Sequence, residues 1–185
     1  YWKDVGTLGS YWEANMELID LIPEFNLYEE FWKIYTSQDM IEPQYIGPNA
    51  KVSKAIVGAG DRIEGEVCNS VLGAGVIVEE GAVVKDSIIM KNTVIHKGAF
   101  VEKSIIAENC EVGADAKIGM GEEAESKLNA SIYAFGLATI GDGSVIPAGV
   151  TIGKNTAIRG VTTIEDYPGK ELESGGYIIK AGEEA

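Results

Sequence analysis

Aliphatic side chains recur at about every sixth residue between Ile46 and Ile164, and this repeat limits the possible folds more than any other feature of the sequence. Of the seventeen steps between successive members, twelve are six residues and three are five. The members are Ile46, Val52, Val57, Ile63, Leu72, Val78, Val84, Ile89, Ile95, Val101, Ile106, Val112, Ile118, Ile140, Ile146, Ile152, Ile158 and Ile164. A helix of 3.6 residues per turn would spread these positions around its circumference, and an antiparallel sandwich would need alternation with hairpin turns. The six-residue step instead predicts a triangular prism with three short parallel strands per coil of about eighteen residues.

Small residues and glycines occupy fixed places in the same repeat. Four residues after an aliphatic position stand Ala50, Ala82, Thr93, Ala99, Cys110, Ala116, Ser144 and Thr156, and glycine often follows the aliphatic residue directly. We expect the aliphatic side chains to point inward, the small ones to fill the corners, and glycine to allow the tight bends. The predicted fold is all-β: a parallel β-helix over residues 46–185, preceded by a short helical segment within residues 1–45.

Two interruptions break the repeat. Residues 64–71 stretch one step to nine residues, which predicts a bulged corner or small loop. Residues 119–139 break the repeat outright and predict an inserted loop, here called the arm, that leaves the prism. A final coil is expected from Ile140 to Ile164, and the tail ending at Ala185 is expected to fray.

The first forty-five residues lack the repeat and hold all three tryptophans. Ser10 and Glu13 have the spacing of a capping box, which predicts a helix that begins at Ser10 and ends near Leu21. The apolar face of this helix is formed by Trp12, Met16 and Ile19. Such a face requires a partner, either the β-helix or a second copy of the helix.

Composition excludes several classes of function. A net charge of −14 disfavours nucleic-acid and membrane-surface partners, and no apolar run is long enough to span a bilayer. Cys68 and Cys110 lack the spacing of a metal or redox motif, and one histidine is too few for an imidazole-based zinc site. These features predict a soluble, cytoplasmic protein. The start at Tyr1 without Met suggests a piece of a longer polypeptide.

Three groups of residues each admit a functional and a structural interpretation. His96 could be the general base of an acyltransferase, but its place next to inward Ile95 favours an exposed surface histidine without a partner. Cys110 is expected to pack at a corner, and Cys68 is less defined. A site for an anionic metabolite effector could involve Arg159, Lys154, Lys170 and Lys180, although a scattered solvated surface is the simpler interpretation.

Several motifs resemble one enzyme family. The opening Tyr1-Trp2-Lys3-Asp4-Val5-Gly6-Thr7, followed by Tyr11-Trp12-Glu13-Ala14-Asn15, resembles the end of the nucleotidyltransferase domain of glucose-1-phosphate adenylyltransferases. Leu27-Tyr28, Trp32 and Ile34-Tyr35-Thr36 resemble the connector of that family. Gly65-Glu66-Val67 and Asn69-Ser70-Val71-Leu72 resemble its β-helix. The resemblance covers nearly the whole chain.

The resemblance implies a function for a longer protein. The family makes ADP-glucose and pyrophosphate from ATP and glucose 1-phosphate for glycogen synthesis, with Mg²⁺ on the phosphates, and its β-helix serves assembly and allosteric control. Asp4 matches an aspartate that helps hold Mg²⁺ in related nucleotidyltransferases, while the alternative is a turn aspartate bonded to backbone amides. The nucleotide loop and catalytic basic residues belong to an N-terminal portion that is absent here, so this chain is expected to be inactive alone.

Further expectations follow from likeness rather than from the spacing. Other hexapeptide-repeat proteins wind left-handed, so a left-handed β-helix is expected. The open ends and long flat faces of the prism also predict an oligomer, either a homo-oligomer or a hetero-oligomer with a paralogue. The arm, with Ile132, Tyr133 and Phe135, is a candidate to reach the neighbouring copy. Three alternatives stay open: a hexapeptide-repeat acyltransferase, a non-catalytic regulatory paralogue, and another sugar-nucleotide pyrophosphorylase.

Overall fold

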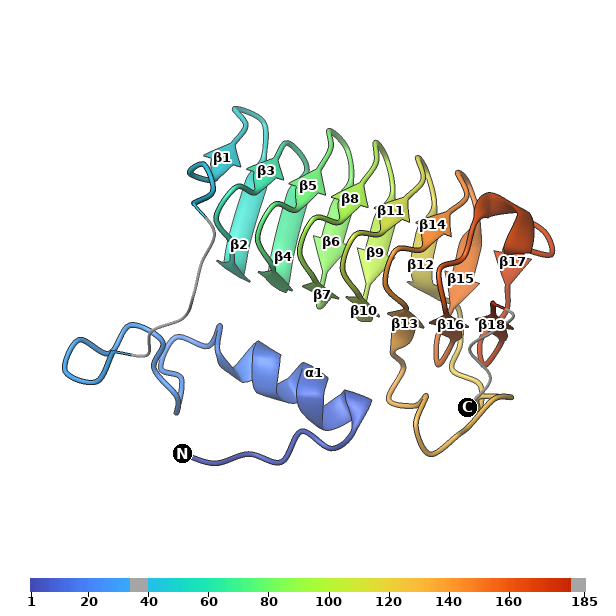
Figure 1. Cartoon of the computed structure of the whole chain (residues 1–185), viewed down its shortest axis with the longest axis horizontal. Helices are drawn as coiled ribbons and strands as arrows, with labels where there is room; N and C mark the ends of the chain where they lie inside the picture. Colours follow the sequence, from blue (N-terminus) through green and yellow to red (C-terminus); the bar gives the residue numbers. More distant parts are fainter. Residues whose placement is uncertain (34–39, 181–185) are drawn as a thin grey trace.

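The computed structural model describes residues 1–33 and 40–180, which form a stack of β coils with one helix along its side (Figure 1). The predicted connector motif Ile34–Thr36 and the frayed tail at 181–185 lie outside the described residues. One face of the prism is built from β1 (Tyr45–Ile46), β3 (Arg62–Ile63), β5 (Ile77–Val78), β8 (Val94–Ile95), β11 (Glu111–Val112) and β14 (Val145–Ile146). We call this the β1–β14 face.

The other two faces belong to one continuous sheet. The second face contains β2 (Lys51–Ile56), β4 (Glu66–Leu72), β6 (Val83–Lys85), β9 (Phe100–Glu102), β12 (Lys117–Met120), β15 (Thr151–Gly153) and β17 (Glu171–Leu172). The third face contains the end of β4 with β7 (Ile88–Ile89), β10 (Ser104–Ile106), β13 (Ala138–Ile140), β16 (Ala157–Arg159) and β18 (Tyr177–Ile179). All pairings between these strands are parallel, which confirms the predicted parallel β-helix.

Most central coils are seventeen residues long. Val78 pairs with Ile95, and Ile95 pairs with Val112, so each coil combines two six-residue steps with one five-residue step. The short step falls at the corner between the second and third faces, where non-glycine residues take positive φ angles, among them Asp86 (49°) and Lys103 (43°). The three five-residue steps of the repeat therefore mark one corner of the prism.

The inward side chains form continuous columns in the centre of the prism. Ile63, Val84, Ile95 and Ile118 are fully buried, and the small corner residues Ala82, Ala99, Thr93 and Cys110 are buried with them. The N-terminal end of the repeat differs from this centre. Ile46 is 45% exposed and Val52 is 37% exposed, because no described coil stacks on their outer side.

The prediction of a bulged corner or small loop at 64–71 is wrong. These residues enter β4, in which fully buried Val67 stacks between Val52 and Val84. The nine-residue step from Ile63 to Leu72 therefore contains one more inward residue, Val67. A Cβ on Gly65 would lie 2.3 Å from the carbonyl oxygen of Ala82, so only glycine fits this tightened corner.

The predicted end of the last coil is also wrong. Ile164 is 61% exposed and begins a short 3-10 turn, Ile164–Asp166, outside the prism. The Asp166 carboxylate accepts a hydrogen bond from the Thr163 amide at 2.7 Å, which stabilises this turn. The chain then returns, and Leu172 and Ile178 complete one more coil from β17 and β18.

Helix α1 (Leu8–Glu17) is shorter and starts earlier than the sequence predicts. Thr7, not Ser10, is the N-cap: its hydroxyl accepts the Ser10 amide at 3.1 Å, and the Ser10 hydroxyl accepts the Thr7 amide at 3.1 Å. The helix ends at Glu17 rather than near Leu21. No helix among the described residues is long and apolar enough to cross a membrane.

Candidate functional site

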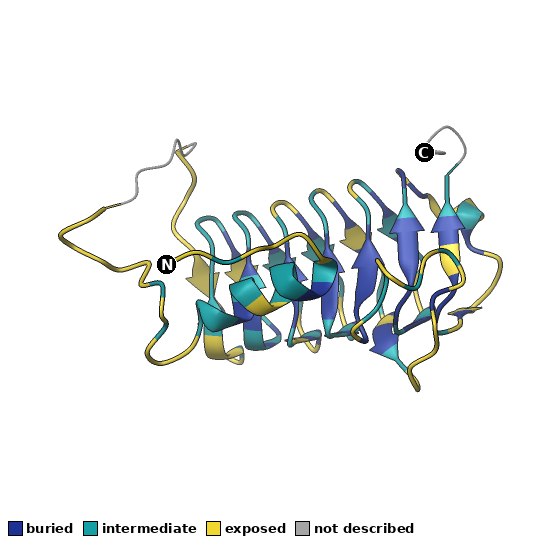
Figure 2. Ribbon diagram, turned by 90° about the horizontal axis from the view of Figure 1, so that it is seen from below, coloured by how far each residue is buried: buried dark blue, intermediate teal, exposed yellow. Residues whose placement is uncertain are grey.

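Helix α1 lies along the outward side of the third face, next to β4, β7 and β10 (Figure 2). Met16 is 8% exposed and packs with the outward-pointing Ile88 and Ile105, which are 3% and 6% exposed, and with buried Leu137 of the arm. The half-buried side chains Leu8, Tyr11, Trp12 and Ile19 extend this cluster. Of the two partners that the sequence predicts for this helix, the structure shows the β-helix.

A regular polar column lies at the corner beside α1. The hydroxyl of Ser70 accepts the amide of Ser87 at 3.2 Å, and the hydroxyl of Ser87 accepts the amide of Ser104 at 3.1 Å. The Trp12 indole donates to the backbone carbonyl of Asp86 at 2.8 Å. The helix is thus attached by apolar packing and by one hydrogen bond to the corner itself.

The arm folds back onto its own chain. Asn155, only 7% exposed, accepts the amide of Gly136 at 2.7 Å and donates to the carbonyl of Ala124 at 2.8 Å. The Phe135 ring lies so close to α1 that a Cβ on Gly9 would be 2.7 Å from it. Glycine at position 9 therefore permits a contact that joins the arm to the first turn of the helix.

Asp4 lies in the segment that leads into α1. Its Oδ1 accepts the Gly6 amide at 2.9 Å in a turn, and the side chain is exposed. Mg²⁺ prefers about six oxygen ligands in near-octahedral geometry. Asp4 could offer one of them, and no group of three His, Cys, Asp or Glu side chains elsewhere in the described residues could complete a site. The described residues alone do not fit the ion, and the metal role of Asp4 stays a prediction for a longer protein.

His96 has neighbours that sequence reasoning missed. Its Nδ1 lies 3.2 Å from a carboxylate oxygen of Glu79, and its Nε2 lies 3.9 Å from one of Glu111. Both glutamates come from neighbouring coils, seventeen and fifteen residues away, so the coil period was the signal that could have found them. The imidazole is about one-third exposed on the β1–β14 face, which agrees with the predicted surface position.

The cysteines have structural roles in the described fold. Cys110 is fully buried in the corner column, where its thiol donates to the Gly141 carbonyl at 3.2 Å, and burial raises its pKa to about 11. The neutral thiol is therefore the stable form, as the packing interpretation predicts. Cys68 is half-buried within β4.

Asp61 is a buried carboxylate that the sequence analysis missed. It is 1% exposed, and its two oxygens accept the amides of Gly58 at 2.7 Å and Val76 at 2.8 Å. Burial raises its pKa to about 6, and the backbone donors oppose that shift. Asp61 stands four residues after Val57, so it occupies a corner position where other coils place a small residue.

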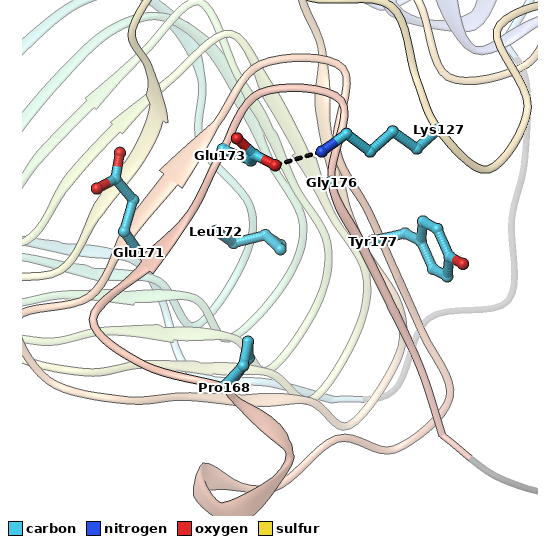
Figure 3. A pocket seen from close by; sticks show the side chains of 7 residues that line it. All are labelled: Lys127, Pro168, Glu171, Leu172, Glu173, Gly176 and Tyr177. Atoms are coloured by element: carbon cyan, nitrogen blue, oxygen red, sulfur yellow. Dashed lines mark hydrogen bonds and ion pairs between the residues drawn. The ribbon is translucent and has the colours of Figure 1, made fainter.

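A hollow of about 490 Å³ opens at the C-terminal end of the prism (Figure 3). Lys127 of the arm faces Glu173 across it and is paired with that carboxylate. The rest of the lining is formed by Pro168, Glu171, Leu172, Gly176 and Tyr177. The hollow has two carboxylates for one lysine, so its charge does not suit an anionic ligand.

One of the basic residues suggested for an effector site, Lys180, is already paired with a carboxylate. Lys180 follows β18 and donates its amide to the carbonyl of Arg159 at 3.0 Å, but its ammonium is paired with Asp166. This pairing holds the pKa of the Asp166 carboxyl at about 2. The effector site stays a prediction.

The stacked hexapeptide coils define a class of protein, and the sequence matches it directly. Residues 42–140 match the model of the GlmU-like, C-terminal hexapeptide family, and the chain belongs to that family. Three curated relatives give a more particular likeness, and each is named glucose-1-phosphate adenylyltransferase. The one from Lachnospira eligens is 67% identical, over 99% of this chain and 43% of the relative.

The other two relatives show the same coverage. The Acetivibrio thermocellus protein is 44% identical over 99% of this chain and 43% of its own length, and the Thermotoga maritima protein is 52% identical over 97% and 42%. The chain thus spans less than half the length of these relatives and matches their C-terminal part. The resemblance inferred from the opening motif is confirmed.

Proposed function

We propose that this chain is the C-terminal assembly and regulatory region of a glucose-1-phosphate adenylyltransferase, which forms ADP-glucose and pyrophosphate from ATP and glucose 1-phosphate. The observation that carries the proposal is the match of nearly the whole chain to the C-terminal part of relatives with that name. The opening motif belongs to the matched region and is attached to the β-helix through α1. The cytoplasm is the proposed location.

The glycine-rich sequences of this chain support a structural role. A Cβ on Gly58 would lie 2.5 Å from the carbonyl oxygen of Gly73, and one on Gly73 would lie 2.7 Å from the amide of Lys91. These glycines are used where successive coils touch, so their backbone is not free to surround a phosphate. In the proposal, nucleotide binding and catalysis belong to the additional residues that the relatives contain.

Asp4 would hold Mg²⁺ only together with groups from those additional residues. When bound, the ion would neutralise charge on the phosphates. This chain contributes the position of the carboxylate, through the turn to Gly6 and the capped helix that follows.

We also propose that the β-helix assembles with a second copy or with a paralogue. The first coil supports this, because Tyr45, Ile46 and Val52 are 51%, 45% and 37% exposed and present an unstacked strand edge. Control by an anionic metabolite is part of the proposal by family likeness. Light scattering at micromolar concentration should give a mass above that of one chain.

Pyrophosphate release from ATP and glucose 1-phosphate tests the proposed reaction. The chain alone should release none above buffer, whereas a polypeptide in which it follows the N-terminal part of the Lachnospira eligens relative should be active. Activity of the chain alone would contradict the proposal that catalysis belongs to the additional residues that the relatives contain. A folded but inactive joined polypeptide would contradict the proposed function and favour the regulatory paralogue.

A further inference from the structure

The β1–β14 face presents one outward side chain from each of its six strands. In Figure 1 these strands line the upper side of the prism, and α1 and the arm lie below it. The strands pair in register, so their outward side chains form one column across the face. In chain order this column contains Tyr45, Arg62, Ile77, Val94, Glu111 and Val145. All six are exposed or half-buried, so the column is accessible to a partner.

This outward column is complementary to itself when its direction is reversed. A second copy with its prism axis reversed sets β5 against β8, β3 against β11 and β1 against β14, because the face has an even number of strands. Arg62 then meets Glu111 of the second copy, and each such pair occurs twice. At the centre, Ile77 meets Val94, so aliphatic side chains pack against each other between the two charged pairs.

The residues that directly follow the strands have the same complementarity. Within one chain, His96 lies 3.2 Å from Glu79, and the Lys97 ammonium lies 3.3 Å from Glu80. Both pairs join the coils of β5 and β8, which are the two central strands of the face. In the reversed arrangement Glu79 also faces His96 of the second copy, and Glu80 faces Lys97. The acids of one copy therefore meet the basic groups of the other.

Charge disfavours the arrangement in which both prisms point in the same direction. Each strand would then face itself, so Arg62 would meet Arg62 of the second copy, and Glu111 would meet Glu111. Like charges placed directly opposite each other are destabilising. The second face is a poorer surface for the reversed arrangement as well. Reversal about its middle strand, β9, would set Val83 against Lys117 and leave that lysine opposite an aliphatic side chain.

We infer that two copies of this chain pack through their β1–β14 faces about a two-fold axis parallel to the strands, with their prism axes antiparallel. The inference rests on the proposed function, because it names the surface and the partner of the assembly proposed there. Both copies use the same patch, as a two-fold interface requires. The aliphatic centre supplies the hydrophobic contact, and the charged pairs set the direction of the second copy.

Charge reversal with rescue tests the pairing of Arg62 with Glu111. Arg62→Glu or Glu111→Arg alone sets like charges opposite each other twice in every dimer, and each should raise the dimer dissociation constant at least about tenfold. An equal mixture of the two variants restores both pairs in the mixed dimer, so its dissociation constant should return to near the wild-type value. Lys117→Glu, an exposed position on the second face, is the control and should leave it unchanged. Sedimentation velocity over a concentration series gives the four values.

Thiol crosslinking tests the direction of the second copy. Tyr45→Cys and Val145→Cys are made separately in a Cys68→Ser background, where Cys110 is buried. Positions 45 and 145 face each other across sheets about 10 Å apart, so a short bismaleimide should join them when the two variants are mixed. Each variant alone should give no product, because its two thiols would lie about 24 Å apart along the face, five strand spacings. Mass spectrometry identifies the crosslinked peptides.

Three outcomes would overturn the inference. Dissociation constants unchanged by both charge reversals would mean that the β1–β14 face is not the interface. A mixture that stays as weak as the single variants would mean that Arg62 does not meet Glu111. A product joining position 45 to position 45, in place of the 45–145 product, would mean that the copies meet at their first coils or point in the same direction.

The same preparations separate this inference from the proposed function. A mass above that of one chain without the 45–145 product would contradict only the inference. The 45–145 product together with a joined polypeptide that releases no pyrophosphate would contradict only the proposed reaction. A mass of one chain at every concentration would contradict this interface and the proposed assembly, and the reaction would keep its own test.

Discussion

The third face of the prism and the β1–β14 face have the same kind of interior and different exteriors. Inward Ile89 and Ile95, one from each face, are both fully buried. Outward Ile88 on the third face is 3% exposed because α1 covers it, whereas outward Ile77 on the β1–β14 face is only half-buried. The inward repeat therefore determines the coil, and the outward residues determine what packs on each face.

The largest effect should come from an inward position. Ile95→Asp would bury an unpaired carboxylate in the column between Val78 and Val112, and should lower the free energy of unfolding by about 3–5 kcal/mol. Ile95→Val is the control and should cost about 1 kcal/mol. Urea denaturation measures both. Equal midpoints for the two variants would mean that position 95 does not point inward.

The comparison of the two faces predicts a smaller difference at outward positions. Ile88→Ala should cost about 2–4 kcal/mol, because it leaves a cavity beneath α1. Ile77→Ala removes the same atoms from a half-exposed site and should cost less than about 1 kcal/mol. Thermal unfolding followed by circular dichroism provides the values. A larger loss of stability for Ile77→Ala than for Ile88→Ala would mean that the β1–β14 face, and not the third face, is the covered one.

Asp61→Asn should cost about 1–3 kcal/mol, since the amide nitrogen would face a backbone N–H that now donates to a carboxylate oxygen. The pKa of Asp61 is about 6 in the folded chain, above its ordinary value of 3.8. A raised pKa means that the folded chain binds the proton more tightly. The stability from this group is therefore fully present below pH 4 and is lost as the pH rises through 6.

Urea denaturation of the wild type and of Asp61→Asn at pH 4.5 and 7.5 tests this titration. The wild type should gain stability at the lower pH relative to the variant. An identical change in both proteins would show that Asp61 is not the group that titrates.

The smallest effect is expected at His96. Its contact with Glu79 lies on a partly exposed surface, where such a pair contributes at most about 1 kcal/mol. His96→Ala should leave the melting temperature within a few degrees of the wild type. A loss of stability comparable to that of Ile88→Ala would mean that the His96–Glu79 pair has a structural role on the β1–β14 face.

The prism was predictable because its inward residues repeat along the chain. The packing of α1 and the arm on its outside was not, because it depends on contacts between segments that are distant in the sequence. The aliphatic pairs Val71-Leu72, Ile88-Ile89 and Ile105-Ile106, spaced by seventeen residues, were a readable sign of a face that is apolar on both sides. Nothing local in the sequence reveals the contact between Gly9 and Phe135 or the bonds of Asn155 to the arm. Val67 was missed because a shortened corner at Gly65 changed the step, and Asp61 because a charged residue replaced a small one.

The opening motif of the candidate site and the family it belongs to could be predicted from the sequence. The packing of this motif on the prism through α1 could not. Asp4 was singled out by resemblance, and its bond to Gly6 is the local turn that its residue type favours. A hollow beside it, lined by Val5, Leu8 and Ile132 among others, depends on the arm, which reaches α1 from more than a hundred residues away. A local sequence pattern does not predict which distant segments come into contact in the fold.

The indole protons of the three tryptophans test most directly whether α1 is an integral covering of the β-helix. Trp2 and Trp32 are 85% and 82% exposed, whereas Trp12 donates its indole proton to the Asp86 carbonyl. In nuclear magnetic resonance spectra, one indole proton should exchange with solvent much more slowly than the other two, and Trp12→Phe should remove that signal. Ile88→Ala should speed its exchange. Three indole protons that exchange equally fast would show that the helix does not rest on the third face, and would contradict the account.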